Sequence, residues 1–232
     1  MVKQDTKTAV SDNGSGLSSA IVAKGKPVTV SAKFTGGVTP YRYKYAYKKD
    51  GGSWVEIKQP KHNNALYSTD DNFSFTLPSQ AGNYTVKVVC RDGVGKTKSK
   101  DFKISVYEIN SYEKEVVRLV NNIRKEYGLG TLTINTDLSM AARLKAEDMH
   151  DNRYFDHTSP TYGSPFDMME QFDITYFTAG ENIAWGQSTP EWVVNSWMNS
   201  PGHRANILNA SYTQIGMGYV SDGNYWSQMF IG

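Results

Sequence analysis

The positions of hydrophobic and polar residues repeat with a period of two through the first half of the chain and with a period near 3.6 through much of the second half. Val28, Val30, Ala32 and Phe34 alternate with polar residues, which is the pattern of a half-buried strand. We predict further strands over residues 41–48, 54–57, 72–77, 83–90 and 98–106. Short strands at this spacing, joined by turns such as Asp50-Gly51-Gly52 and Asp92-Gly93, predict an antiparallel β-sandwich.

One of these strands carries a row of tyrosines at every second position, Tyr41, Tyr43, Tyr45 and Tyr47, with mostly cationic residues between them. Because successive side chains of a strand point to opposite faces, the four rings share one face and the cations share the other. Two interpretations stay open. The rings, with Trp54, line the core of the sandwich, or they stack on sugar rings or contact a partner peptide.

The period changes near Tyr107, so we place the boundary between the two halves within residues 106–111. A first helix begins after the cap Asn110 and ends near Gly128. Further helices are predicted over residues 137–152, 165–172 and 190–199. Residues 214–220 and 225–231 form a hairpin around Ser221-Asp222-Gly223-Asn224, which makes this half α+β and layered.

The length of 232 residues suits two domains, a sandwich over 21–107 and an α+β domain over 108–232. Residues 1–20 are expected to be a flexible leader that followed a removed signal. The 25 basic and 23 acidic residues are spread without long blocks, so the overall balance gives no electrostatic reason to expect nucleic acid. No apolar run reaches the roughly 18 residues of a membrane helix. The single cysteine, Cys90, excludes an internal disulfide and is expected to pack as a small hydrophobe.

The densest candidate chemistry lies in the stretch from Trp197 to Arg204. Pro201 suits the first position of a helix, which makes Ser200 the expected N-cap and places His203 in the first helical turn. The helix dipole opposes a positive charge there. An imidazole kept neutral in this way suits metal ligation or proton abstraction. Two further polar groups, His157 and Glu181, lie upstream, and we predict that the fold brings all three together.

Five stretches of the second half, in order, are similar to a known family: Val120-Asn121-Asn122-Ile123-Arg124, the segment 155–160, Gly180-Glu181-Asn182-Ile183-Ala184, the segment 197–204 and the closing segment 225–230. Together they resemble the CAP superfamily of cysteine-rich secretory, antigen 5 and pathogenesis-related 1 proteins, in its shorter bacterial SCP-like branch. The resemblance implies an α-β-α sandwich, export from the cell, and a groove lined by two histidines and two acids that sometimes holds a divalent metal. The first half resembles the immunoglobulin-like modules of exported bacterial proteins, on its Tyr-x-Tyr-x-Tyr and Gly-Asn-Tyr-Thr-Val strands.

Carried over motif by motif, the resemblance makes His157 and His203 the two histidines and Glu181 the first acid. The second acid falls at Ser200, so the tetrad is incomplete. Two histidines and one carboxylate supply three zinc-type ligands with an open fourth position, a site that would bind a divalent metal such as zinc weakly. The alternative is that backbone groups satisfy each histidine, while Glu181 sits at a bend and accepts a backbone hydrogen bond.

Ser200 itself has two interpretations. As a nucleophile it would be activated by His203 and oriented by Glu181. As an N-cap it needs no catalysis. His150 and His62 are most simply solvated or satisfied, and Trp185 is expected to pack around the groove.

Three functions therefore remain open. In the first, which we favour, an exported bacterial protein binds a small molecule, lipid, glycan or peptide in the groove, with a loosely held metal, while the sandwich spaces or attaches it at the cell surface. In the second, His157, Glu181 and His203 surround a metal-activated water in a peptidase or cell-wall hydrolase. In the third, the tyrosine face is adhesive and contacts a glycan or a host protein.

Overall fold

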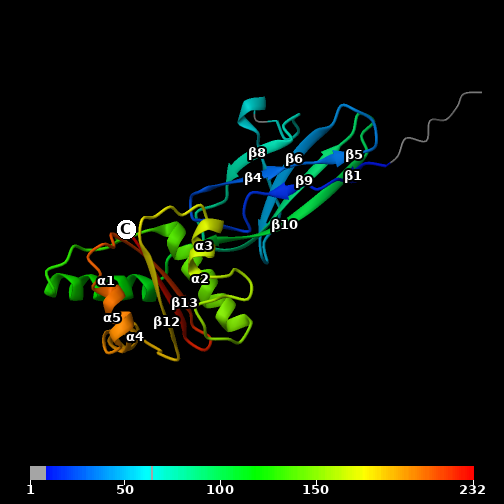
Figure 1. Ribbon diagram of the computed structural model, residues 1–232. Coiled ribbons are helices and arrows are strands. Elements are labelled where there is room, and N and C mark those ends of the chain that lie inside the picture. The colour runs from blue at the N-terminus through cyan, green and yellow to red at the C-terminus, as the bar shows by residue number, and fades with distance from the viewer. Residues whose placement is uncertain (1–8, 64) are drawn as a thin grey trace, which may run out of the picture. The chain divides into compact units, whose positions relative to one another are not determined.

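The computed structural model describes residues 9–63 and 65–232, and its chain divides into two compact units, Met1–Glu108 and Ile109–Gly232 (Figure 1). We call them the sandwich unit and the C-terminal unit. The division falls within residues 106–111, where the hydrophobic period changes. None of the helices in the described part of the chain has the length and apolar character needed to cross a membrane.

The sandwich unit consists of short, mainly antiparallel strands, which confirms the predicted all-β, immunoglobulin-like sandwich. A five-stranded sheet has the order β3-β10-β9-β6-β7, a three-stranded sheet has the order β2-β4-β8, and β1 pairs with β5. Only the pairing of β3 with β10 is parallel among the described strands of this unit. The strands are β1 Ser11–Asp12, β2 Gly16–Leu17, β3 Ile21–Ala23, β4 Pro27–Ser31, β5 Phe34–Thr35, β6 Arg42–Lys49, β7 Val55–Ile57, β8 Asn72–Thr76, β9 Gly82–Arg91 and β10 Thr97–Tyr107.

Two of these strands, β1 and β2, lie inside the segment that was expected to be a flexible leader. Their backbones pair with β5 and β4, and Asn13 N–H donates to the carbonyl of Lys33 at 2.7 Å. The prediction of a leader over 1–20 is therefore wrong from residue 11 onward. Short edge strands with polar side chains lack a hydrophobic pattern in the sequence, even though their backbones are hydrogen-bonded to neighbouring strands. Residues 1–8 lie outside the described part of the chain.

The tyrosine row belongs to the core; Tyr43, Tyr45 and Tyr47 lie on β6, and Tyr41 directly precedes this strand. Tyr43 and Tyr45 are buried, and Tyr41 and Tyr47 pack against the same cluster. The hydroxyl of Tyr45 donates to the carbonyl of Asp70 at 2.7 Å, which satisfies its polar end. The two buried rings cannot stack on a sugar, and the other two pack against the same core, so the structure favours the core interpretation of the tyrosine row. Trp54, expected in this core, is instead 39% exposed.

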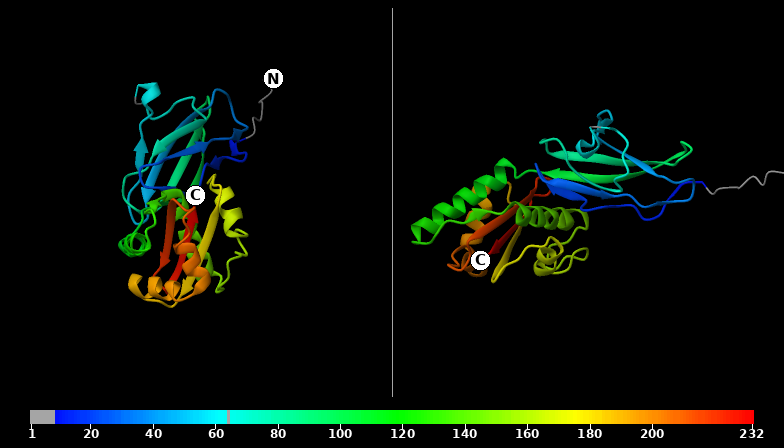
Figure 2. Two further views of the ribbon diagram at one scale, coloured as in Figure 1. Left: turned by 60° about the vertical axis from the view of Figure 1, so that its left-hand side comes forward. Right: turned by 90° about the horizontal axis from the view of Figure 1, so that it is seen from above.

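The C-terminal unit is built on a four-stranded sheet of order β11-β13-β14-β12 (Figure 2). The hairpin of β13 (Gln214–Val220) and β14 (Tyr225–Ile231) has the predicted bounds. The short β11 (Thr133–Ile134) pairs parallel to β13, and β12 (Ala179–Trp185) pairs antiparallel to β14. The helices are α1 Ser111–Glu126, α2 Thr136–Asp151, α3 Pro165–Gln171, α4 Pro190–Met198 and α5 Pro201–Ile207.

Helices cover both faces of this sheet, which gives the expected α-β-α layers. On one face, residues of α1, α4 and α5 form a core with Ile215, Met217, Trp226 and Phe230 of the sheet. On the other face, α2 and α3 pack on Met229 and Ile231. The period-two alternation of β14 therefore buries both of its faces, as the middle layer of a sandwich requires.

Two glycines of β13 allow α2 to approach the sheet very closely. A Cβ atom on Gly216 would lie 2.4 Å from the carbonyl carbon of Leu138, and one on Gly218 would lie 2.2 Å from that of Ala142. The Ser139 hydroxyl also accepts the N–H of Met217 at 3.2 Å. Glycine at both positions thus sets the distance between α2 and the sheet.

A buried arginine of α1, Arg124, connects this helix to the loop after it and to the segment that follows α5. The guanidinium of Arg124 donates to the carbonyls of Gly130, Ile207, Asn209 and Tyr212 at 2.7–3.2 Å. Burial lowers its pKa, and the four acceptors make it a structural anchor for the segment after α5.

Candidate functional site at the edge of the sheet

The site is organised by β12, which is an edge strand of the sheet. Glu181 lies opposite Met229 in the register, and Asn182 lies opposite Gln228. Because Met229 packs in the core under α2, Glu181 points to the α2 side while Asn182 points to the α5 side. The expectation that Glu181 sits at a bend is wrong, because Glu181 lies inside β12. The sequence of this strand does not alternate regularly between apolar and polar residues, so it was not predicted as a strand.

Glu181 and His157 form the central contact of the site. His157 Nδ1 lies 2.6 Å from Glu181 Oε2, and the Ser227 hydroxyl donates to Glu181 Oε1 at 3.2 Å. The Glu181 side chain is only 2% exposed, whereas that of His157 is 54% exposed. The hydrogen bond to Glu181 raises the pKa of His157 against an opposing effect of burial. A buried carboxylate therefore orients a solvent-accessible imidazole through Nδ1 and leaves Nε2 for other partners.

Lys145 of α2 holds the loop that carries His157 in place by hydrogen bonds to the loop backbone. Its Nζ donates to the carbonyls of Asp156 at 2.6 Å and His157 at 2.8 Å, and to the Tyr154 hydroxyl at 3.1 Å. Lys145 is fully buried, and burial lowers its pKa. Three protein acceptors thus take the place of water around its ammonium group, and these hydrogen bonds fix the position of the His157 backbone.

Asp148, one turn further along α2, holds the other side of this loop. Its carboxylate accepts hydrogen bonds from the hydroxyl groups of Tyr154 and Ser159, each at 2.6 Å. It also accepts hydrogen bonds from the Thr161 hydroxyl and from the side-chain amide of Asn152. Burial opposes its ionisation, but these bonds together lower its pKa. Sequence analysis missed both α2 residues, although two charged residues within the buried stripe of a helix are a usable signal.

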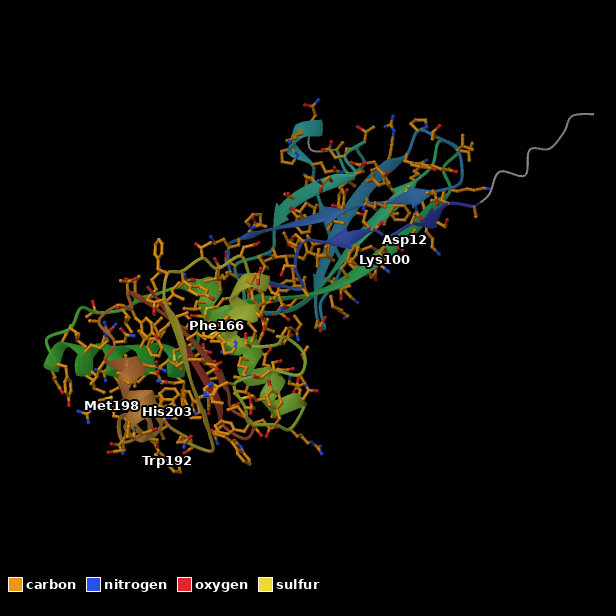
Figure 3. The ribbon with its side chains drawn as sticks, in the orientation of Figure 1. Asp12, Lys100, Phe166, Trp192, Met198 and His203 are labelled. Carbon is orange, nitrogen blue, oxygen red and sulfur yellow. The ribbon has the colours of Figure 1, made fainter. Side chains whose placement is uncertain are left out.

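His203 lies in the first turn of α5, on the face of the sheet opposite to that of Glu181 (Figure 3). Asn182 donates to the carbonyl of His203 at 3.1 Å, and Asn206 donates to the carbonyl of Glu181, also at 3.1 Å. Burial lowers the pKa of His203, and the charge of nearby His157 lowers it further. Both effects favour the neutral form of the imidazole.

Ser200 occupies the N-cap position of α5 with an extended backbone, yet its hydroxyl does not cap the helix. This part of the N-cap prediction is wrong. Among the described residues, no side-chain hydrogen bond links Ser200 to His203 either, so a serine–histidine–glutamate triad is not assembled here. Glu181 pairs with His157 instead.

The residues present do not fit a three-ligand zinc site. Within residues 9–63 and 65–232, no group of three or more His, Cys, Asp or Glu side chains is placed to hold a metal ion. Glu181 is committed to His157 and Ser227, which leaves two imidazoles, one fewer than the three protein ligands usual for catalytic zinc. His150, elsewhere on α2, pairs with Asp151 and Asp222, and the side chain of His62 lies outside the described part of the chain.

Exposed aromatic rings continue from the histidine site along β12. Phe155, two residues before His157, is 47% exposed and lies 6.3 Å from Trp185, which is 56% exposed. Trp185 in turn stacks on Tyr225 with 5.6 Å between the ring centroids. We call Phe155, Trp185 and Tyr225 the aromatic shelf. Trp185 was expected to pack around the groove; it packs against Phe155 and Tyr225, and more than half of its surface stays exposed.

Comparison with known proteins agrees with this architecture. The profile of the CAP family, the cysteine-rich secretory protein family, matches residues 117–231. Uncharacterized protein YkwD of Bacillus subtilis is 60% identical over 124 residues, which are 53% of this chain and 48% of YkwD. Uncharacterized membrane protein YlbC of the same organism is 40% identical over 119 residues, 51% of this chain and 34% of YlbC. The chain thus spans half or less of the length of these relatives.

Among solved structures, an extracellular protein containing an SCP domain from Bacillus anthracis has a TM-score of 0.50 and 20% identity, covering 88% of this chain and 77% of that one. This likeness concerns the fold. The layered sheet, the ordered motifs and the profile match agree with one another. The C-terminal unit of this chain belongs to the CAP family.

Proposed function

We propose that the CAP unit is an extracellular binding module whose ligand is a small molecule or peptide carrying an anionic group beside an apolar group. The anionic group lies on His157 and His203, and the apolar group lies on the aromatic shelf. The Bacillus anthracis protein with the same fold is described as extracellular, which supports a place outside the cell. The sandwich unit serves as a spacer or attachment module.

The observation that carries this proposal is the contact between His157 and Glu181. A buried carboxylate holds the exposed imidazole in one orientation and raises its pKa, so a protonated Nε2 can donate to a carboxylate or phosphate oxygen. His203 adds an imidazole that favours its neutral form and is close enough to His157 to feel its charge. Within the described residues, the Ser200 hydroxyl makes no hydrogen bond to a histidine, which favours binding over covalent catalysis.

The proposal is tested with N-acetyl-phenylalanine and its amide, which differ only in the carboxylate, by NMR of the histidine rings of the full chain. We expect the acid to shift the His157 signals and to bind about tenfold more tightly than the amide, which is the typical value of one charge-assisted hydrogen bond. His157→Ala should abolish the difference, and His150→Ala, which changes a histidine outside the site, should preserve it. Equal affinity for acid and amide would refute the proposed anionic subsite.

A hydrolase is the second candidate, since the 2.6 Å contact between His157 and Glu181 also suits a general base. Its test is the turnover of peptide and peptidoglycan substrates by the wild type and by His157→Ala. Turnover that disappears in the variant would favour the hydrolase. Equal background rates would end this alternative.

Weak binding of zinc by His157 and His203 stays a prediction. Equilibrium dialysis of the wild type against the double variant His157→Ala/His203→Ala tests it. Equal zinc retention by both proteins would contradict it.

A further inference from the structure

The two units carry opposite net charges, which the balance of the whole chain conceals. Residues 1–108 contain 17 Lys and Arg against 9 Asp and Glu, a net of +8, whereas residues 109–232 contain 8 against 14, a net of −6. The sum is the +2 of the whole chain. The sandwich unit is therefore strongly basic, and its function as a spacer does not require this charge.

The strand register collects part of this charge on the outward face of the five-stranded sheet. In β6 and β9, Arg42 lies opposite Arg91, and Lys87 lies opposite Ala46, while the tyrosines of β6 point into the core. Side chains that are directly opposite share a face of the sheet. We call this surface the cationic face; it consists of Arg42, Lys44, Lys48, Lys87, Arg91 and Lys103.

Half of these cations lack a carboxylate partner. Lys44 pairs with Glu56, and Lys87 pairs with Asp101. Lys103 pairs with Asp50.

Within the described residues, Arg42, Lys48 and Arg91 make no ion pair. Lys48 and Arg91 instead lie over aromatic rings, Lys48 over Trp54 at 5.1 Å and Arg91 over Tyr67 at 5.8 Å from the ring centroids. Three cations thus remain available for anions from outside.

A hollow of about 510 Å³ opens at one end of the cationic face, and Arg42, Tyr67 and Arg91 contribute to its lining. Asp92 also lines the hollow, but only 4% of this residue is exposed. Its carboxylate accepts hydrogen bonds from the backbone N–H groups of Val38, Val94 and Lys96, so backbone donors already satisfy its negative charge. Two guanidinium groups remain around the hollow, and guanidinium binds carboxylates in a bidentate manner.

We propose that the cationic face binds an acidic polysaccharide that carries a carboxylate on its sugar rings. The cations lie on the neighbouring strands β6, β9 and β10, and neighbouring strands are about 4.8 Å apart, so the face presents closely spaced charges to a linear polymer. Single-stranded nucleic acid would need open ring faces for base stacking, but Trp54 lies beneath Lys48 and Lys87, and Tyr67 lies beneath Lys44 and Arg91. The same covered rings do not suit insertion into a bilayer.

The test uses the full chain and polygalacturonate, with neutral dextran as the control polymer, and measures binding over a range of salt concentrations. The site variant is Arg42→Glu/Lys48→Glu/Arg91→Glu. The matched control, Lys26→Glu/Lys33→Glu/Lys98→Glu, makes the same change in net charge at exposed positions outside the cationic face. Urea unfolding of both variants verifies that the sandwich is intact.

We expect salt-sensitive binding of polygalacturonate, no binding of dextran, and a loss of about tenfold to a hundredfold in affinity for the site variant, because three exposed charge pairs become repulsions. The matched control should lose less than about threefold. Equal loss in both variants would overturn the proposal, because net charge alone would then explain binding. It would equally be overturned by absent binding, or by tighter binding to phosphatidylglycerol vesicles or to a single-stranded polynucleotide.

Discussion

Replacing Gly218 by alanine tests whether the approach of α2 to the sheet positions the site. The added Cβ would lie 2.2 Å from the carbonyl carbon and oxygen of Ala142, whereas ordinary contact begins at 3.4 Å, so α2 must move by about 1.2 Å. The obstacle is helix backbone, which has no rotamer to change. We expect a loss of about 3 kcal/mol in unfolding free energy, the upper end of the usual overpacking range.

The same displacement should disturb the site. Lys145 lies one turn after Ala142, and its bonds to the carbonyls of Asp156 and His157 are 2.6 and 2.8 Å long. A movement of about 1.2 Å would take both beyond hydrogen-bonding distance. The His157 NMR signals of Gly218→Ala should therefore broaden or shift even where the protein remains folded.

Urea unfolding followed by tryptophan fluorescence measures the stability, since Trp197 and Trp226 are fully buried in this unit. The control is Gly202→Ala, because a Cβ at this helical position meets nothing within 4 Å. It should stabilise the unit by about 0.5–1 kcal/mol through the lower entropy of the unfolded chain. An unfolding midpoint for Gly218→Ala equal to that of the wild type would refute the reasoning.

Three further predictions follow from the buried polar groups. Glu181→Gln should lower the pKa of His157, because it removes the carboxylate that raises it and leaves burial in place; an unchanged pKa in an NMR titration would contradict the pairing. The pKa of Asp148 is lowered in the folded state, so its contribution to stability is complete above the ordinary aspartate pKa and is lost as the pH falls through the folded value. Asp148→Asn should therefore flatten the acid limb of the stability curve measured by urea unfolding, and an unaltered limb would be evidence against this. Arg124→Met should cost about 2–5 kcal/mol, because it removes the guanidinium donor from the buried carbonyls of Ile207 and Tyr212, and thermal unfolding measures the loss.

The sandwich illustrates how one strand pattern carries two interpretations that packing then separates. The alternation in β6 predicts rings on one face and cations on the other, and the register confirms this division. The pattern alone does not say which face lies inward. The second sheet covers the tyrosines, so the surface left for partners is the cationic one.

The sequence by itself determined the helices and the hairpin of the C-terminal unit and the residues worth examining. Asn110, Asn135 and Thr189 cap their helices, and the hairpin has its predicted bounds, because caps, turns and apolar periods are local signals. The ordered motifs likewise pointed to His157 and His203 before any fold was known.

Only the tertiary structure decided how these residues work together. It placed Glu181 in an edge strand beside His157, 24 residues away in the sequence. It also placed the buried ammonium group of Lys145 within hydrogen-bonding distance of the His157 carbonyl. The reason is that a local pattern encodes which face of an element is buried, whereas the partner of a buried polar group depends on how several distant elements pack together.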